Sequence, residues 1–125
     1  MLTQHGQFQV KIDGKTIHVA SRGSFNAEGT LKCCEAIDHA IAQLAPSHFL
    51  ICVDLTEFEG ATPDAWDITE QFNQALLSHP LTAKAIIVKS RFVESYVETV
   101  NQSEIRHKTQ VFSNSQQALT WLNSH

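Results

Sequence analysis

Asp54 and Thr56 are the residues whose type and position best suit chemistry, because they close a short apolar run at 49–53. The run is rich in β-branched and aromatic residues, which predicts a strand buried on both faces. An acid and a hydroxyl do not fit an apolar layer, so they mark the strand's carboxyl end, where open α/β sheets place ligand or partner sites. Asp54 could face a cleft and sense a ligand or a phosphate. We favour a structural role for both side chains, accepting hydrogen bonds or tying down the next loop.

The segment from Phe58 to Trp66 predicts a loop and the start of a helix. Gly60 suits the loop, and Thr62 could cap the helix by accepting a hydrogen bond from a backbone N–H group. A free helix N-terminus would also offer N–H donors to an anion, although Asp64 would repel one somewhat. Phe58 and Trp66 lie beside the predicted buried stripes rather than on them, so we expect both rings at a surface or an interface, with Trp66 half exposed.

Lys89 and Ser90 directly follow a second predicted strand at 83–88. Ser90 could serve as a nucleophile, or it could cap the next helix, which we favour. Lys89 and Arg91 place positive charge at the same sheet edge as Asp54, which would suit an anionic ligand, an acidic patch of a partner, or a surface ion pair. The chain has neither a Gly-x-Ser-x-Gly elbow nor a Gly-rich phosphate loop, so we assign no catalytic residue.

The histidines and cysteines do not follow a metal-binding pattern. The seven histidines are widely separated, and none forms an i, i+4 pair on a predicted helix. The three cysteines lack a Cys-x-x-Cys spacing. We therefore predict no metal and no cofactor, and we expect Cys33, Cys34 and Cys52 to be small residues of the core or its flank.

Size and composition predict one domain spanning 1–125. The chain has 125 residues, 42% of them hydrophobic and 18% charged, as in ordinary globular domains. A formal net charge of −4 argues against a general nucleic-acid binder. The apolar runs are too short for a membrane span, and the N-terminus lacks a signal-peptide pattern, so a cytoplasmic location is the default expectation.

Strands and helices alternate along the chain in the order β-β-α-β-α-β-α-β-α. This order predicts an α/β fold with a mixed, mostly parallel five-stranded sheet and four helices. The hairpin signal is Asp13-Gly14, and the expected caps are Asn26, Thr62 and Ser113. The apolar and turn patterns place strands at 8–12, 17–20, 49–56, 83–88 and 109–112, and helices after 26, after 62, over 92–100 and after 113.

Short motifs spread over nearly the whole chain carry a family resemblance. They are His5-Gly6-x-Phe8, Gly23, Asn26-x-Glu28-Gly29, Val53-Asp54-Leu55-Thr56, Gly60-Ala61-Thr62-Pro63, Val111-Phe112 and Ala118-Leu119-Thr120-Trp121-Leu122. With the element order, they resemble the STAS and SpoIIAA-like superfamily, and most of all the small stand-alone bacterial proteins of its STAS-like, Sec14-related branch. The resemblance implies regulatory partners that often self-associate, and lipid carriage in Sec14-type relatives. Anti-sigma factor antagonists of this fold carry a phosphorylated serine in an Asp-Ser-Ser-Gly-like stretch, whereas Thr62 is the nearest hydroxyl here.

We therefore expect a non-enzymatic regulatory or interaction module that binds a protein partner, or a small anionic or apolar ligand, at the loop after the central strand. The expected binding face consists of Asp54, Thr56, Phe58, Gly60, Thr62, Trp66, Lys89 and Ser90. We also expect a two-fold homodimer formed through Phe58 and Trp66. Two alternatives stay open: a small enzyme with a cleft of Asp54, Lys89 and Ser90, and a lipid carrier, which needs a gap of the order of several hundred Å³.

Overall fold

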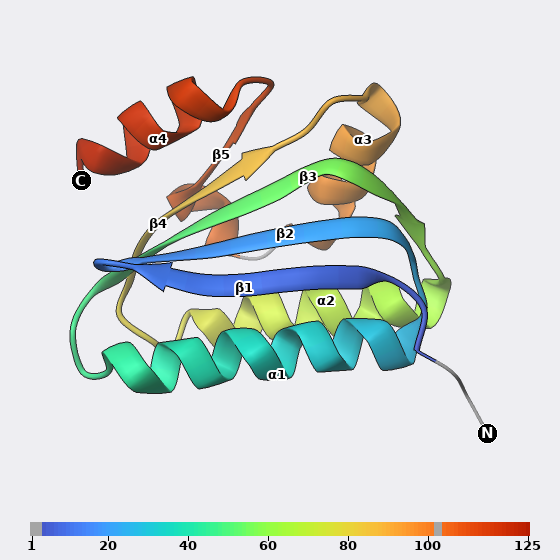
Figure 1. Cartoon of the computed structure of the whole chain (residues 1–125), viewed down its shortest axis with the longest axis horizontal. Coiled ribbons are helices and arrows are strands. Elements are labelled where there is room, and N and C mark those ends of the chain that lie inside the picture. Colours follow the sequence, from blue (N-terminus) through green and yellow to red (C-terminus); the bar gives the residue numbers. More distant parts are fainter. Residues whose placement is uncertain (1–3, 102–103) are drawn as a thin grey trace.

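A computed structural model of the protein describes residues 4–101 and 104–125, which form a five-stranded sheet in the order β1-β2-β3-β4-β5 (Figure 1). The strands are β1 (Gln7–Asp13), β2 (Thr16–Phe25), β3 (Phe49–Ala61), β4 (Leu81–Ile87) and β5 (Thr109–Phe112). The helices are α1 (Ala27–Leu44), α2 (Pro63–Leu76), α3 (Arg91–Val100), the short 3-10 helix η1 (Glu104–Lys108) and α4 (Ser115–Asn123). Only the β1–β2 pair is antiparallel in this sheet. The predicted α/β order is confirmed, with η1 as an addition.

Helices cover both faces of the sheet. In Figure 1, α1 and α2 lie side by side against one face, and α4 lies on the other. The larger apolar core joins α1, α2 and α3 to the sheet and includes Ile17, Ile37, Ile51, Leu76 and Val97. A smaller core beneath α4 includes Cys52, Ala85, Ile87, Ala118 and Leu122. Two separate cores explain why Cys52 and Ile51, which are neighbours in β3, are both buried.

The segment before β1 is held against the start of α1. The Asn26 side-chain oxygen accepts hydrogen bonds from the Gly29 N–H at 2.9 Å and from the His5 N–H at 3.0 Å. A Cβ atom at Gly29 would lie 2.0 Å from the His5 carbonyl oxygen, so only glycine allows the two segments to approach this closely. Asn26 is thus the predicted cap of α1, and it also anchors the chain's beginning.

The central strand continues past the point where the sequence predicts its end. We expected a loop after Thr56, but β3 runs to Ala61, because β2 continues beside it and pairs Arg22 with Glu57 and Phe25 with Ala61. The pairing moves from Ala20–Asp54 to Arg22–Glu57, so β3 contains one residue more than β2 at this step. This bulge shifts the next side chains of β3, Glu57 and Phe58, to the opposite face, and a second register shift follows between Phe58 and Gly60.

One predicted helix cap, Ser113, is wrong, and another, Thr62, has the predicted position without the predicted hydrogen bond. Thr62 occupies the N-cap position of α2, but its hydroxyl donates to the Asp64 carboxylate instead of accepting from a backbone N–H group. Asn114 rather than Ser113 caps α4, accepting from the Gln117 N–H at 3.1 Å. The hairpin turn is likewise one residue later than expected, at Gly14-Lys15, with Gly14 at φ +62°. Local composition locates these helix and turn boundaries only to within a residue.

Candidate functional site

Asp54 and Thr56 bond to each other on β3. One carboxylate oxygen of Asp54 accepts from the Thr56 N–H at 2.9 Å and from the Thr56 hydroxyl at 2.7 Å. Both residues are half-buried. This is the structural arrangement that we favoured for the pair, although it ties a strand rather than a loop.

Phe58 belongs to the core and not to the surface. Its exposed fraction is 7%, and its ring centroid lies 4.8 Å from that of Tyr96 and 5.8 Å from that of Phe25. The prediction of a surface position is wrong because it placed Phe58 in a loop after Thr56, whereas β3 continues to Ala61. The bulge in β3 places Phe58 on the same face as Leu55, three residues earlier, and that face is covered by helices.

Trp66 is half-buried, as the sequence predicts, but its polar and apolar parts are already engaged. The indole N–H donates to the Ala61 carbonyl at 2.9 Å. The ring packs edge-on against Tyr96, with 5.3 Å between centroids. Trp66 therefore fastens the first turn of α2 to the end of β3 and to α3, so it is poorly suited to be the centre of an interface.

The structure does not bring Asp54, Lys89 and Ser90 together in a cleft. Ser90 caps α3, accepting from the Val93 N–H at 3.2 Å, as we favoured over a nucleophilic role. Lys89 is exposed. Asp54 faces two shallow hollows on the sheet surface with Gln9 and Ala20, and neither hollow includes Lys89 or Ser90. The arrangement provides no shared site for an acid, a base and a nucleophile.

Phe92 is the most exposed large hydrophobic residue of the described chain, with an exposed fraction of 66%. Its ring lies over Gly60, where an added Cβ atom would be 3.7 Å from a ring carbon of Phe92. Phe92 is followed on α3 by Val93, Tyr96 and Val97, which are all buried, so the apolar pattern of the helix hides its exposure. We call Gly60, Lys89, Ser90, Arg91 and Phe92 the Phe92 surface. It contains three of the residues that the sequence placed on a binding face.

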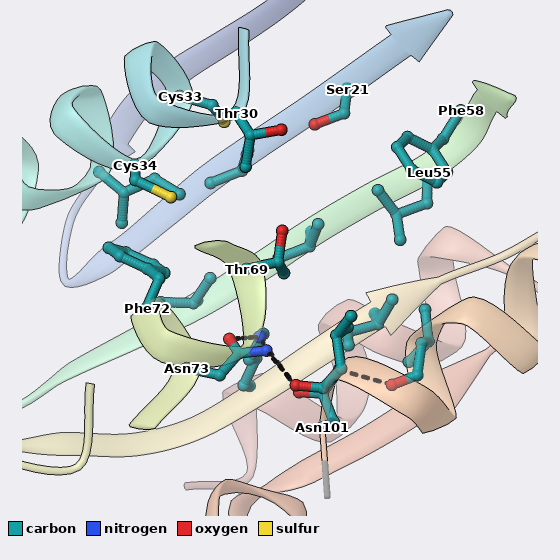
Figure 2. Close-up of a pocket in the computed structure, with 18 of the residues that line it drawn as sticks. Ser21, Thr30, Cys33, Cys34, Leu55, Phe58, Thr69, Phe72, Asn73 and Asn101 are labelled. Atoms are coloured by element: carbon teal, nitrogen blue, oxygen red, sulfur yellow. Dashed lines mark hydrogen bonds between the residues drawn. The ribbon is translucent and has the colours of Figure 1, made fainter. Parts of the chain in front are cut away.

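A cavity of about 110 Å³ lies between the sheet and helices α1, α2 and α3. Figure 2 shows hydroxyl and thiol groups around it, from Ser21, Thr30, Cys33, Cys34 and Thr69. Phe25, Leu55, Phe58, Phe72 and Leu76 are among its apolar lining residues. The cavity is smaller than the gap that a lipid chain requires, which argues against the lipid-carrier alternative.

Lys84 lines this cavity from the middle of β4 and has an exposed fraction of 6%. Its ammonium donates to the side-chain oxygen of Asn73 at 2.9 Å and to that of Asn101 at 3.4 Å. The two amide groups are oriented by the backbone, because their nitrogens donate to the Val100 carbonyl at 2.8 Å and the Val97 carbonyl at 2.9 Å. Sequence reasoning missed Lys84, although a lysine inside an apolar strand is a signal of a buried polar site.

Burial determines the protonation of the groups around the cavity. It lowers the pKa of Lys84 to about 8, with the nearby Cys34 thiol acting in the opposite direction. Burial also raises the pKa of Cys33 to about 11 and that of Cys34 to about 12, and it raises the pKa of the Tyr96 phenol. At neutral pH the thiols and the phenol are therefore uncharged, and Lys84 supplies the positive charge.

Three solved structures are similar to this chain along almost its entire length. One is an uncharacterised protein of the DUF3478 family with a SpoIIAA-like fold from Shewanella loihica PV-4, with a TM-score of 0.69, 15% identity, and coverage of 98% of this chain and 97% of that chain. The chain has a SpoIIAA-like fold. An anti-sigma factor antagonist from Mycobacterium paratuberculosis has a TM-score of 0.69, 13% identity and 95% coverage of both chains. The anti-sigma factor antagonist SpoIIAA, in its unphosphorylated form, has a TM-score of 0.65 and 10% identity, with 95% of this chain and 100% of that chain covered.

These likenesses confirm the predicted resemblance at the level of the fold. No protein-family model and no curated protein sequence matches the chain. Among residues 4–101 and 104–125, no helix is both long and apolar enough to cross a bilayer. No cluster of three or more potential metal ligands was found in that same part of the chain.

Proposed function

We propose that residues 1–125 form one STAS-like domain that acts as a non-enzymatic, cytoplasmic regulatory module and binds a protein partner through the Phe92 surface. The observation that carries the proposal is the 66% exposure of the Phe92 ring above Gly60. Two of the structures with this fold are anti-sigma factor antagonists, so regulation through protein binding is compatible with this architecture.

The composition of the Phe92 surface fits an interface. An aromatic ring at the centre can supply about 2 kcal/mol or more of binding free energy when a partner covers it. Lys89 and Arg91 beside it are exposed, as is Glu59 next to Gly60. Charges around an apolar centre form the polar rim that is typical of protein interfaces, where they select the partner.

The partner can be a second copy of this chain. The homodimer is then best tested at Phe92, and not at Phe58 and Trp66, through which we first expected it to form. Phe58 is buried and Trp66 is bonded to Ala61, so replacing either would disturb the fold. Phe92→Ser removes an exposed ring without opening a cavity. Leu31, on α1 with an exposed fraction of 45%, supplies the matched control Leu31→Ser.

The test compares wild type, Phe92→Ser and Leu31→Ser in cross-linking and quantitative affinity capture, followed by titration with the purified partner. We expect a partner that binds wild type and Leu31→Ser equally well and binds Phe92→Ser about thirtyfold more weakly. Sedimentation velocity of the three proteins tests the homodimer in the same way. If Phe92→Ser retains every specific partner and the wild-type oligomeric state, the Phe92 surface is not the binding site.

A further inference from the structure

The charge of Lys84 has no counter-charge in the described structure. Its ammonium, with an exposed fraction of 6%, has two amide oxygens as partners, and one of them lies at the long distance of 3.4 Å. Among the described residues, no carboxylate forms an ion pair with it. A buried cation is costly unless an anion and hydrogen bonds compensate for its lost hydration. Lys84 therefore faces the cavity with at least one N–H group and its net charge uncompensated.

The rest of the cavity is suited to a small molecule with one polar end. Figure 2 shows the hydroxyl groups of Ser21, Thr30 and Thr69 around the cavity, where those of Thr30 and Thr69 donate to the backbone carbonyls of Asn26 at 2.9 Å and Ala65 at 3.0 Å. Leu55, Phe58 and Phe72 supply apolar walls. A cavity of about 150 Å³ accepts benzene, so the present 110 Å³ corresponds to a ligand of about four to six non-hydrogen atoms.

We propose that this cavity binds a short-chain monocarboxylate, with its carboxylate on the Lys84 ammonium and its hydrocarbon part against the apolar walls. The carboxylate supplies the missing negative charge and accepts the free ammonium N–H. Charge-assisted hydrogen bonds of this kind are stronger than those of neutral groups, especially where water is excluded. The Thr30 and Thr69 hydroxyls already donate to the Asn26 and Ala65 carbonyls, so the Lys84 ammonium is the group that recognises the carboxylate.

Partly exposed residues at the cavity's edge provide access from solvent. Cys34 on α1 and Thr69 and Phe72 on α2 line the cavity and are each half-buried. Helices α1 and α2 pack directly against each other, so a small displacement of their side chains would open the gap between them. A ligand of a few atoms can pass there without unfolding either helix.

The pH dependence of binding follows from the groups that face Lys84. Cys33 and Cys34 approach from α1, Tyr96 from α3, and the neutral Asn73 and Thr69 from α2. Burial keeps the pKa of both thiols near 11 or above, and it raises that of Tyr96. Lys84, whose pKa is lowered to about 8, is therefore the group that loses its charge first as pH rises above neutral. A monocarboxylate stays ionised throughout this range.

The test is a titration of the ¹⁵N-labelled protein with butyrate, which has six non-hydrogen atoms, followed by NMR. We expect chemical-shift changes at the cavity-lining residues, with binding about tenfold weaker for Lys84→Met and unchanged for Lys32→Met, whose lysine is exposed on α1. Butyramide, a neutral molecule of the same shape, should bind wild type about tenfold more weakly than butyrate. Wild-type affinity for butyrate should fall by a similar factor between pH 7 and pH 9.5.

Several results would overturn the proposal. One is the absence of shift changes in the cavity at about 50 mM butyrate, a concentration that detects even weak binding. Another is equal binding of butyrate and butyramide, which would mean that the carboxylate is not recognised. If Lys84→Met does not fold, the wild-type pH series tests the role of Lys84 instead. An affinity for butyrate that is constant from pH 7 to pH 9.5 would exclude the Lys84 ammonium as the group that binds the carboxylate. None of these outcomes involves the Phe92 surface, so the proposed protein-binding function is tested separately.

Discussion

Replacing Lys84 with methionine should change how the stability of the protein depends on pH. Burial lowers the pKa of Lys84 from its ordinary 10.5 to about 8. A difference of this size corresponds to about 3 kcal/mol of unfolding free energy. The unfolded chain then binds the lysine proton more tightly than the folded protein, so stability rises with pH between 8 and 10.5 and the full penalty is present below pH 8.

Lys84→Met has no titrating group at this position and should therefore lack that rise. The difference in unfolding free energy, variant minus wild type, should decrease by about 2 to 3 kcal/mol between pH 7 and pH 10. Loss of the hydrogen bonds to Asn73 and Asn101 adds an offset that is the same at each pH. Burial holds the pKa of Cys33 near 11 and that of Cys34 near 12, and loss of the Lys84 charge would raise the pKa of Cys34 further, so both thiols stay protonated in both folded proteins up to pH 10 and their effect cancels in the difference.

The assay is urea unfolding of both proteins at pH 7, 8.5 and 10, monitored by tryptophan fluorescence. The free energies are compared as differences at each pH, which removes the titration of groups common to both proteins. Lys32→Met, a substitution at an exposed position of α1, serves as the control and should show a constant difference. A constant difference for Lys84→Met as well would refute the claim that Lys84 is buried as an uncompensated cation.

Two further substitutions test the assignments made from contacts. Asn26→Ala should destabilise the protein by about 1 to 2 kcal/mol, because it removes the α1 cap and the anchor of His5, whereas Thr62→Ala should have a smaller effect since Thr62 makes no cap bond to the backbone. Urea midpoints compare the two, and an equal loss would contradict this assignment. Phe58→Ala should cost about 3 to 5 kcal/mol as a buried ring, but Phe92→Ser less than about 0.5 kcal/mol. Thermal unfolding measures both, and similar losses would place the two rings in equivalent environments.

The order and type of the elements follow from the sequence alone, because they depend on patterns a few residues long. The spacing of apolar residues predicts each main helix, and β-branched runs predict the strands. Asn26 and Ser90 could be recognised as caps since their partners lie three residues away in the chain. The alternation of strands and helices then predicts a mainly parallel sheet, which the structure confirms.

The site depended on contacts between distant segments, which no local pattern specifies. The bulge that directs the Phe58 side chain into the core exists only because β2 continues beside β3. The exposure of Phe92 depends on where α3 lies relative to Gly60, more than thirty residues earlier.

Lys84 shows the same limit most clearly, because its two hydrogen-bond partners and the cavity beside it come from separate parts of the chain. Asn73 is on α2, Asn101 follows α3, and the cavity is bounded on its far side by α1. Lys84 stands out within its apolar strand, but nothing in the stretches around Asn73 and Asn101 marks them as its partners. Helix packing decides that a lysine in an apolar strand meets two amide oxygens and a cavity, since side chains from separate segments converge only when the chain is folded.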